Sequence, residues 1–200
     1  MQAKRLIVAI TGASGAIYGV RALQELRAMG GMEIHLIISP SAARTLREET
    51  EFTMDDVRAL AHVIHNHKDI GASIASGSFR TLGMIVAPCS VKSLSAIAHS
   101  YDEDLTARAA DVCLKERRRL VLLFRETPLH AGHIDLMAQA TRIGAIIMPP
   151  IPSFYNRPAS VNDIVDQSVG RMLDLFDLEN TLVTRWAGTG ATAHSRDEEA

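Results

Sequence analysis

The sequence predicts an α/β fold, in which one mainly parallel sheet is covered by helices on both faces. Short runs of apolar and β-branched residues recur along the chain, and segments with helical periodicity separate them. This alternation is typical of parallel sheets, because a helix commonly connects neighbouring parallel strands. The 200 residues are 47% hydrophobic, which suits one domain with a full core. The five runs are residues 6–10, 34–38, 84–87, 120–124 and 145–148.

The first run leads into a glycine turn at residues 11–16 and then into an amphipathic segment at 17–29. Glycines let a backbone approach a ligand, and the N–H groups at a helix start attract anions. The turn therefore suits a phosphate, although a structural corner explains it equally well. Its spacing, Gly12, Gly15 and Gly19, matches neither the dinucleotide nor the triphosphate-binding pattern.

The second run ends in Ser39 and Pro40. A nicotinamide dinucleotide site would place an acidic residue there, to bind a ribose hydroxyl. The sequence therefore disfavours nicotinamide cofactors and, together with the glycine spacing, nucleoside triphosphates.

After the third run, Ser90 is a candidate N-cap for a further helix. This second helix start lies on the same edge of the predicted sheet, where ligands of such folds bind. Capping alone explains Ser90. Lys92 is well placed for a phosphate, but an exposed lysine is common on any surface.

A helical segment at residues 104–119 places Arg108 and Lys115 on one face, two turns apart. We expect Lys115 to point inward. The arginines at 117–119 are explained by a solvated C-terminal turn, where cations suit the helix dipole.

Arg125 and Glu126 directly follow the fourth run. A guanidinium at this edge can bind a phosphate through two charge-assisted hydrogen bonds. Glu126 is either the salt-bridge partner of Arg125 or an acid–base group with a pKa raised by burial. The residue pattern leaves both interpretations open.

Four prolines between residues 149 and 158 predict a stiff connection that holds Tyr155 in place. A long helix follows at 161–178, in which a surface position is the simplest explanation of Arg171. From Ala187 onward the chain is small, polar and then acidic, and we expect this tail, residues 187–200, to be flexible.

The composition excludes several classes of function. A formal net charge of −2 gives no basic surface for nucleic acid or an anionic membrane. No apolar run reaches the roughly 20 residues of a membrane span, and the N-terminus has no signal-peptide pattern. We therefore expect a cytoplasmic location. Cys89 and Cys113 lie too far apart in sequence for a Cys-x-x-Cys motif, which disfavours a zinc site.

Histidines cluster in two places, but neither cluster includes the further ligands of a recognisable metal set. No serine hydrolase motif is present. We therefore expect no metal. The clustered histidines are His62, His65, His67, His130 and His133.

Five motifs occur in a specific order along the chain. They are T-G-A-S-G-A at 11–16, P-C-S-x-K-[ST]-L at 88–94, R-A-A-D-V-x-L-K-E-R-R at 108–118, R-E-T-P-L at 125–129 and P-x-x-x-F-Y-x-x-P at 150–158. Over residues 5–186 this set resembles the UbiX-type flavin prenyltransferases.

The resemblance implies a single-domain Rossmann-like, or flavodoxin-like, three-layer sandwich over residues 1–186, assembled into a homododecamer. It further implies an enzyme that joins the dimethylallyl group of dimethylallyl monophosphate to N5 and C6 of reduced FMN. The product, prenylated FMN, would serve a UbiD-type decarboxylase.

The same resemblance implies a role for individual residues. Ser14 and Glu126 would manage protons near flavin N5, and Glu49 would reach in from a neighbouring subunit. The implied FMN contacts are Gly12, Ala13, Ser14, Ser39, Ser90, Val91, Lys92, Ser93 and Arg125. The implied prenyl-donor contacts are Tyr155, Arg171, Lys115, Arg125 and Trp186, of which Lys115 also counts as catalytic.

These residues suit the implied chemistry. Breaking an allylic C–O bond leaves a delocalised cation and a phosphate, so a site must neutralise the leaving group and exclude water. Lys115, Arg125 and Arg171 would do the first without a metal, and the aromatic faces of Tyr155 and Trp186 would shield the cation.

One position departs from the resemblance: many relatives have a lysine after Ser39, where this chain has Pro40. This makes Ser39 the weakest of the implied FMN contacts. Two alternatives remain. One is an FMN-dependent decarboxylase of the cysteine-decarboxylase group, whose P-A-S-A-N-T and P-x-M-N motifs mismatch this chain at 88–93 and 150–153. The other is a non-catalytic module that binds or delivers FMN.

Overall fold

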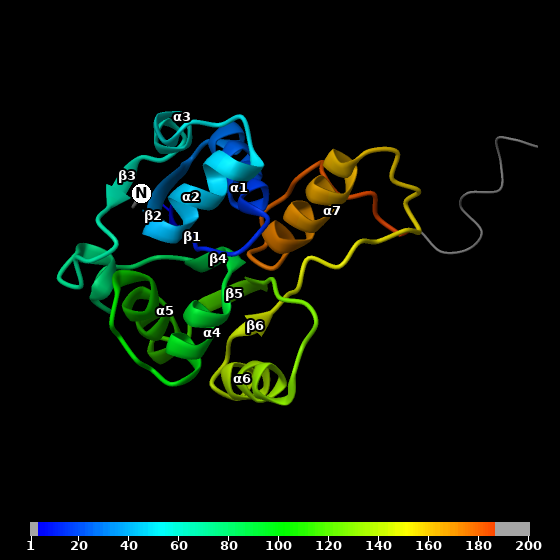
Figure 1. The fold of residues 1–200 in the computed structure, drawn as a ribbon. Helices are drawn as coiled ribbons and strands as arrows, with labels where there is room; N and C mark the ends of the chain where they lie inside the picture. The colour runs from blue at the N-terminus through cyan, green and yellow to red at the C-terminus, as the bar shows by residue number, and fades with distance from the viewer. Residues whose placement is uncertain (1–3, 187–200) are drawn as a thin grey trace, which may run out of the picture.

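The computed structural model describes residues 4–186, and its centre is one six-stranded sheet in the order β3-β2-β1-β4-β5-β6. Every neighbouring pair of strands is parallel (Figure 1). The predicted α/β class with a parallel sheet is therefore confirmed. The strands are β1 (Lys4–Ile10), β2 (Met32–Ile38), β3 (Val63–His65), β4 (Gly83–Cys89), β5 (Arg119–Phe124) and β6 (Ile146–Ile147).

Within this described range, seven α-helices connect or follow these strands. Figure 1 shows α1, α2 and α3 on one side of the strands and α4, α5 and α6 on the other. The helices are α1 (Ala16–Met29), α2 (Pro40–Glu49), α3 (Met54–Ala59), α4 (Val91–Ala98), α5 (Leu105–Lys115), α6 (Ala131–Arg142) and α7 (Val161–Asp174), and a short 3₁₀ helix spans Ser73–Ala75.

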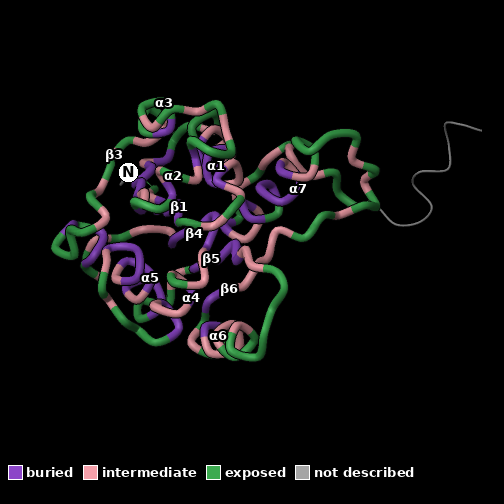
Figure 2. Tube along the Cα trace, in the orientation of Figure 1, coloured by how far each residue is buried: buried purple, intermediate pink, exposed green. Residues whose placement is uncertain are grey.

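The alternating side chains of the central strand divide the core into two layers. Leu6 and Val8 of β1 pack with residues of α1 and α7, whereas Ile7 and Ala9 pack with residues of α4 and α5. Figure 2 shows the central strands as buried, with exposed segments confined to helix faces and loops. The result is the three-layer sandwich that the sequence predicts.

The chain reverses its direction of travel across the sheet after β3. From β1 it proceeds to β2 and β3 on one side, and it then returns to place β4 on the other side of β1. Ligands of open parallel sheets bind at such a reversal, outside the carboxyl ends of the strands. The topology therefore puts the turns after β1 and β4 next to each other.

The largest differences from the sequence prediction are one additional strand and the ends of two helices. Strand β3 was not predicted, because it has only three residues and lies at the edge of the sheet, partly exposed. The segment expected to be helical to residue 119 ends at Lys115, since Arg117 has a positive φ of 56° and Arg119 already begins β5. Helix α7 ends at Asp174, and residue 178 lies beyond it.

None of the helices in the described part of the chain has the length and apolar character that crossing a membrane requires. The tail expected to be flexible, 187–200, lies outside the described residues.

Candidate functional site

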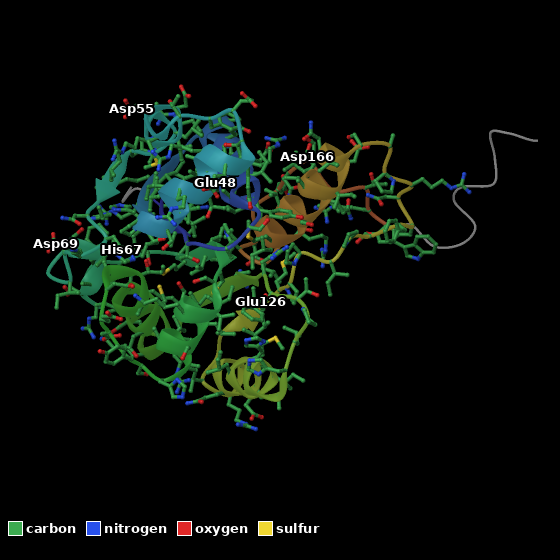
Figure 3. All side chains as sticks on the ribbon, in the orientation of Figure 1. Glu48, Asp55, His67, Asp69, Glu126 and Asp166 are labelled. Atoms are coloured by element: carbon green, nitrogen blue, oxygen red, sulfur yellow. The ribbon has the colours of Figure 1, made fainter. Side chains whose placement is uncertain are left out.

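A cavity of about 800 Å³ lies at the carboxyl edge of the sheet. Its wall is built from the segments that follow five successive strands and from the start of α5. Figure 3 labels His67 and Glu126, which both line the cavity but come from opposite halves of the sheet. The lining residues are Gly12, Ala13, Ser14, Ser39, Pro40, Ser41, His67, Lys68, Ser90, Val91, Lys92, Ser93, Glu103, Asp104, Arg125 and Glu126.

Thr11 joins the turn after β1 to the turn after β4. Its hydroxyl donates a hydrogen bond to the carbonyl of Pro88 (2.7 Å) and accepts one from the N–H of Ser90 (2.9 Å). The side chain is 1% exposed, so both bonds are shielded from water. Thr11 therefore fixes the spacing of the two turns that form the floor of the cavity.

The glycine turn has a backbone that other residues would not adopt easily. Gly15 has a φ of 99°, in the left-handed region. At Gly12, an added Cβ would overlap the side chain of Ser41. These glycines let the start of α1 and the start of α2 approach each other closely.

The start of α1 already holds an anion from its own chain. The Glu49 carboxylate accepts hydrogen bonds from the N–H groups of Gly15 (2.7 Å) and Ala16 (3.4 Å). A carboxylate is favourable there because the first N–H groups of a helix have no partner within it. Glu49 therefore lies against the glycine turn of its own chain. The resemblance implies that Glu49 reaches in from a neighbouring subunit, and that role and a phosphate at this turn both stay predictions.

The turn after β4 behaves as predicted for a capped helix. The Ser90 hydroxyl accepts a hydrogen bond from the N–H of Ser93 (3.2 Å) and lies 3.0 Å from the Ser93 hydroxyl. The first-turn N–H groups of Val91 and Lys92 have no partner within the helix. Lys92 is exposed and lies 3.5 Å from Glu103, so its charge is shared with a carboxylate at the cavity rim.

Ser39 caps α2, and its hydroxyl accepts a hydrogen bond from the N–H of Ala42 (3.1 Å). Pro40 occupies the first position of the helix, where the missing N–H costs nothing. Proline therefore fits this turn without disturbing Ser39, which stays on the cavity wall.

Arg125 directly follows β5, and its positive charge is available to a ligand. Its N–H donates to the carbonyl of Cys89 (3.1 Å), which fixes the backbone. Among residues 4–186 no carboxylate lies within ion-pair distance of the Arg125 guanidinium, and Glu126 instead accepts a hydrogen bond from the N–H of Thr127 (2.9 Å). The salt-bridge interpretation of Glu126 is therefore wrong for this structure. Burial raises the pKa of Tyr18, and the nearby positive charge of Arg125 partly offsets that rise.

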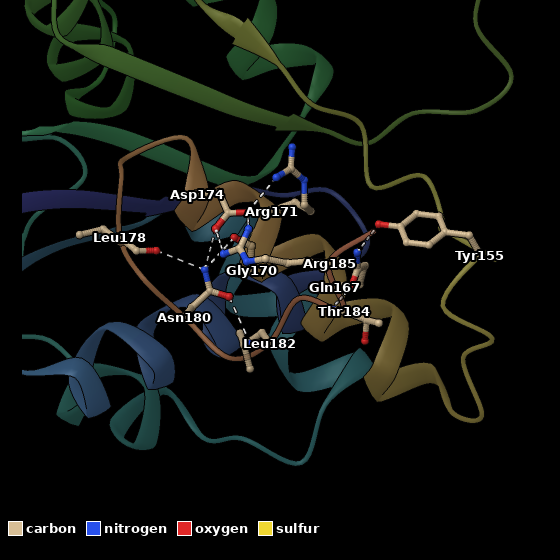
Figure 4. A network of polar contacts seen from close by, with 10 residues as sticks. All are labelled: Tyr155, Gln167, Gly170, Arg171, Asp174, Leu178, Asn180, Leu182, Thr184 and Arg185. Atoms are coloured by element: carbon tan, nitrogen blue, oxygen red, sulfur yellow. Dashed lines mark hydrogen bonds and ion pairs between the residues drawn. The ribbon is translucent and has the colours of Figure 1, made fainter. Parts of the chain in front are cut away.

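Tyr155, Arg171 and Trp186 form a second group, away from the cavity wall. Figure 4 shows Tyr155 on the loop before α7 and Arg171 on α7. The rings of Tyr155 and Trp186 meet edge to face, with 5.8 Å between their centroids. Arg171 is about half exposed and donates to Asp174 (2.7 Å), which also holds Arg185 (2.9 Å). The group presents aromatic surface and two guanidiniums against one carboxylate.

Lys115 lies at neither group. Its ammonium contacts Glu116 (2.8 Å) and the side chain is nearly half exposed. Helix α5 begins beside the cavity at Asp104, and Lys115 is 11 residues further on, which is about 16 Å along the helix axis. Within one chain Lys115 therefore lies away from the cavity wall, and its role in the site stays a prediction.

Comparisons with known proteins agree with this architecture. A family model described as Flavoprotein matches residues 1–186. The flavin prenyltransferase UbiX of Escherichia coli K12 is 59% identical over 187 residues, which cover 92% of this chain and 99% of that protein. UbiX of Thauera aromatica is 55% identical over 184 residues, covering 92% and 94%. The chain belongs to the UbiX family.

Solved UbiX structures share the fold closely. AnUbiX (PadA1), determined in complex with FMN and dimethylallyl pyrophosphate, superimposes with a TM-score of 0.91 at 51% identity, covering 94% of this chain and 99% of that one. A dodecameric FMN-dependent UbiX-like decarboxylase from Escherichia coli O157:H7 gives 0.90 at 50% identity, covering 92% and 100%. The cysteine decarboxylase TvaF is 14% identical with a TM-score of 0.58, and so shares the fold alone.

In this UbiX-family chain, the predicted site residues fall into separate sets. The cavity brings together all the implied FMN contacts and Glu126, and Glu49 touches the adjoining turn. Tyr155 and Arg171 lie at α7, Trp186 packs against Tyr155, and Lys115 lies apart from both sets.

Several residues of the UbiX-family cavity were missed from the sequence. His67 lies 3.3 Å from Asp104, and Asp104 also caps α5 by accepting from the N–H of Ala107 (3.0 Å). Burial raises the pKa of Asp104, but the bonds from His67 and Ala107 outweigh it and hold the pKa below its usual value. The capping pattern could have identified Asp104, whereas His67 follows the unpredicted strand β3. The other missed lining residues are Pro40, Ser41, Lys68 and Glu103.

The remaining titratable clusters do not form a metal centre. Across residues 4–186 no group of three histidine, cysteine or acidic side chains has the geometry to hold an ion. Burial raises the pKa of the Cys113 thiol to about 12, and burial likewise raises the pKa of Cys89. Neither cysteine is therefore a thiolate at neutral pH.

Proposed function

We propose that this chain is a flavin prenyltransferase that joins the dimethylallyl group of dimethylallyl monophosphate to N5 and C6 of reduced FMN. The proposal is supported by a cavity that places Ser14, Arg125 and Glu126 together. The chain around it is 59% identical to a UbiX flavin prenyltransferase. The cysteine-decarboxylase alternative is not favoured, since its representative shares only the fold.

The cavity fits FMN in size and in chemistry. Its volume of about 800 Å³ lies in the range of small-molecule sites. The free guanidinium of Arg125 and the first-turn N–H groups of α4 are donors suited to an anionic, oxygen-rich ligand. Gly12 lets the turn after β1 lie against Ser41 on this wall, where a Cβ would collide.

When bound, reduced FMN supplies the nitrogen and carbon that form bonds to the prenyl group. Around it, three of the chain's own residues have two tasks. Arg125 offsets negative charge, and the Ser14 hydroxyl and the Glu126 carboxyl hold or accept protons at the cavity wall. Glu126 suits this task because its carboxylate is not engaged by a cation.

The prenyl donor would be bound by Tyr155, Arg171 and Trp186. Two arginines share the single carboxylate of Asp174, which leaves net positive charge for a phosphate. Edge and face contacts with the aromatic pair would shield the allylic cation from water.

We further propose that copies of the chain complete one another's sites in a homododecamer. Tyr155, Arg171 and Lys115 lie outside the cavity wall of their own chain, so contact between copies is the route by which they would reach FMN. A related UbiX-like protein is dodecameric. Delivery of the product to a UbiD-type decarboxylase and the cytoplasmic location stay predictions from the sequence.

Release of inorganic phosphate tests the proposal. The protein is incubated anaerobically with dimethylallyl monophosphate, with or without reduced FMN, and phosphate is measured. We expect release only when both substrates are present. Dimethylallyl pyrophosphate serves as the comparison donor, and with it the pyrophosphate leaving group is measured instead. Release without flavin would identify a phosphatase instead and contradict the proposal.

A further inference from the structure

Gln167 is a buried amide in α7 whose two ends are both engaged. The side chain is 3% exposed. Its nitrogen lies 2.8 Å from the hydroxyl of Tyr155, and its oxygen lies 3.0 Å from the backbone nitrogen of Thr184 (Figure 4). Gln167 therefore connects three segments: α7, the proline-rich loop and the irregular segment at residues 181–186.

The contact with Thr184 fixes which way the amide faces. A backbone N–H can only donate, so the atom of Gln167 that meets it must be the carbonyl oxygen. The amide NH₂ then faces Tyr155 and donates to the phenol oxygen. As the phenol oxygen is accepting, the O–H hydrogen of Tyr155 is left to donate elsewhere.

Arg171 lies on the same face of α7 as Gln167, one turn further along. Asp174, another three residues on, holds the guanidiniums of Arg171 and Arg185. The hydroxyl of Tyr155 is therefore held by a residue that lies one helical turn before Arg171.

We propose that Gln167 is a positioning residue that sets the hydrogen-bond direction of Tyr155, so that the phenol donates to an anionic oxygen bound beside Arg171. This inference rests on the proposed function, in which that oxygen belongs to the phosphate of the prenyl donor. A carboxylate at position 167 would accept the phenol hydrogen instead and withdraw it from the ligand.

The decisive variant is Gln167→Glu, which keeps the side-chain size and the oxygen that accepts from Thr184. We expect the KM for the prenyl donor to rise about ten- to a hundredfold, the scale of one lost hydrogen bond to a charged group. The affinity for FMN should not change, since Gln167 does not line the cavity. The assay is run toward the alkaline end of the working range, where the introduced carboxyl is ionised.

Two further variants distinguish a change in the hydrogen-bond direction of Tyr155 from a change in the packing around Gln167. Tyr155→Phe should raise the donor KM to the same extent, and Gln167→Glu should add no further loss in that background.

Gln167→Met removes both contacts. Trp186 is the only tryptophan, so its fluorescence reports on the segment that Thr184 anchors. Its emission should shift to longer wavelength in Gln167→Met and stay unchanged in Gln167→Glu.

An unchanged donor KM in Gln167→Glu would overturn the proposal, as would an equal further loss in the Tyr155→Phe background. A binding assay tests Gln167 independently of prenyl transfer. Inorganic phosphate is titrated into the full-length, FMN-loaded protein, and binding is monitored by the fluorescence of Trp186. Phosphate binding that Gln167→Glu weakens would support Gln167 even if no prenyl transfer occurred. Phosphate binding equal in the two proteins would reject it.

Discussion

At the scale of single residues, the role of Glu126 depends on its freedom from Arg125. Its carboxylate lies on the cavity wall, and within residues 4–186 its one hydrogen bond comes from the N–H of Thr127. An acid–base residue must be able to gain and lose a proton, which a tight ion pair would hinder.

Glu126→Gln keeps the shape of the side chain and removes the titrating group. We expect single-turnover prenylation to slow by about 10²- to 10⁴-fold, the usual size of a general acid–base contribution. FMN affinity, measured by flavin fluorescence, should stay the same. Equal single-turnover rates in the two proteins would remove Glu126 from the mechanism.

Thr11 is a second residue that can be tested alone, through the hydrogen bonds of its hydroxyl to the turn after β4. In Thr11→Val the side chain keeps its shape but leaves the N–H of Ser90 without a buried partner. The carbonyl of Pro88 loses the hydroxyl and keeps the N–H of residue 11 (3.2 Å). We expect a loss of about 2 kcal/mol in the free energy of unfolding, together with weaker FMN binding, because the two turns lose their side-chain link.

Thr11→Ser is the matched control, because it restores the hydroxyl. Urea denaturation and FMN titration should show it close to the wild type in both respects. If Thr11→Val bound FMN as the wild type does, the link between the turns would not matter for the site.

At the scale of elements, Asp104 combines a helix cap with the contact to His67 at the cavity rim. Its pKa is lowered in the folded protein, so the stabilisation by its charged form is present above the unfolded pKa. That stabilisation is lost as pH falls through the lower, folded pKa.

Asp104→Asn keeps a capping side chain and removes the charge. The wild type should be more stable than this variant at neutral pH, and the difference should vanish in acid. Asp104→Ala should lose about 1 kcal/mol more, because the cap of α5 is also gone. Urea denaturation across a pH series measures both effects. A difference that did not depend on pH would show that the charge of Asp104 does not stabilise the fold.

The elements also show what could be predicted from the sequence. Long apolar runs such as residues 6–10 and 120–124 identified their strands, because burial on both faces leaves few polar positions. Strand β3 was not predicted, because three half-exposed residues carry no periodic signal. Ser90 was predicted as a cap from residue type alone, and the structure confirms it.

Long-range partners were harder to predict. Nothing near Glu49 in the sequence indicates that its carboxylate reaches Gly15 of the same chain. Likewise, the direction of α5 relative to the sheet decides that Asp104 borders the cavity and Lys115 does not. Such contacts follow from the packing of whole elements, which local pattern does not specify.

At the scale of the whole molecule, the separation of the two site groups predicts complementation between copies. Glu126→Gln damages the cavity, whereas Arg171→Ala damages the group beside α7. If a working site combines the two groups from different copies, mixed oligomers of the two inactive proteins will contain some intact sites.

We expect activity to return when the two variants are co-expressed, at a fraction of the wild-type level. Each variant expressed alone should stay inactive, and light scattering should give the same oligomer for all. Failure of mixed oligomers of verified composition to recover activity would show that each site is built within one chain.

The central claim is that the cavity at the carboxyl edge of the sheet is where a prenyl group becomes bonded to FMN. It is tested most directly by mass spectrometry of the flavin extracted after anaerobic incubation with reduced FMN and dimethylallyl monophosphate. The account predicts a flavin heavier by one C₅H₈ unit with the wild type, and greatly reduced amounts with Glu126→Gln. Unmodified FMN alone, recovered from folded, FMN-loaded wild-type protein under verified reduction, would contradict it.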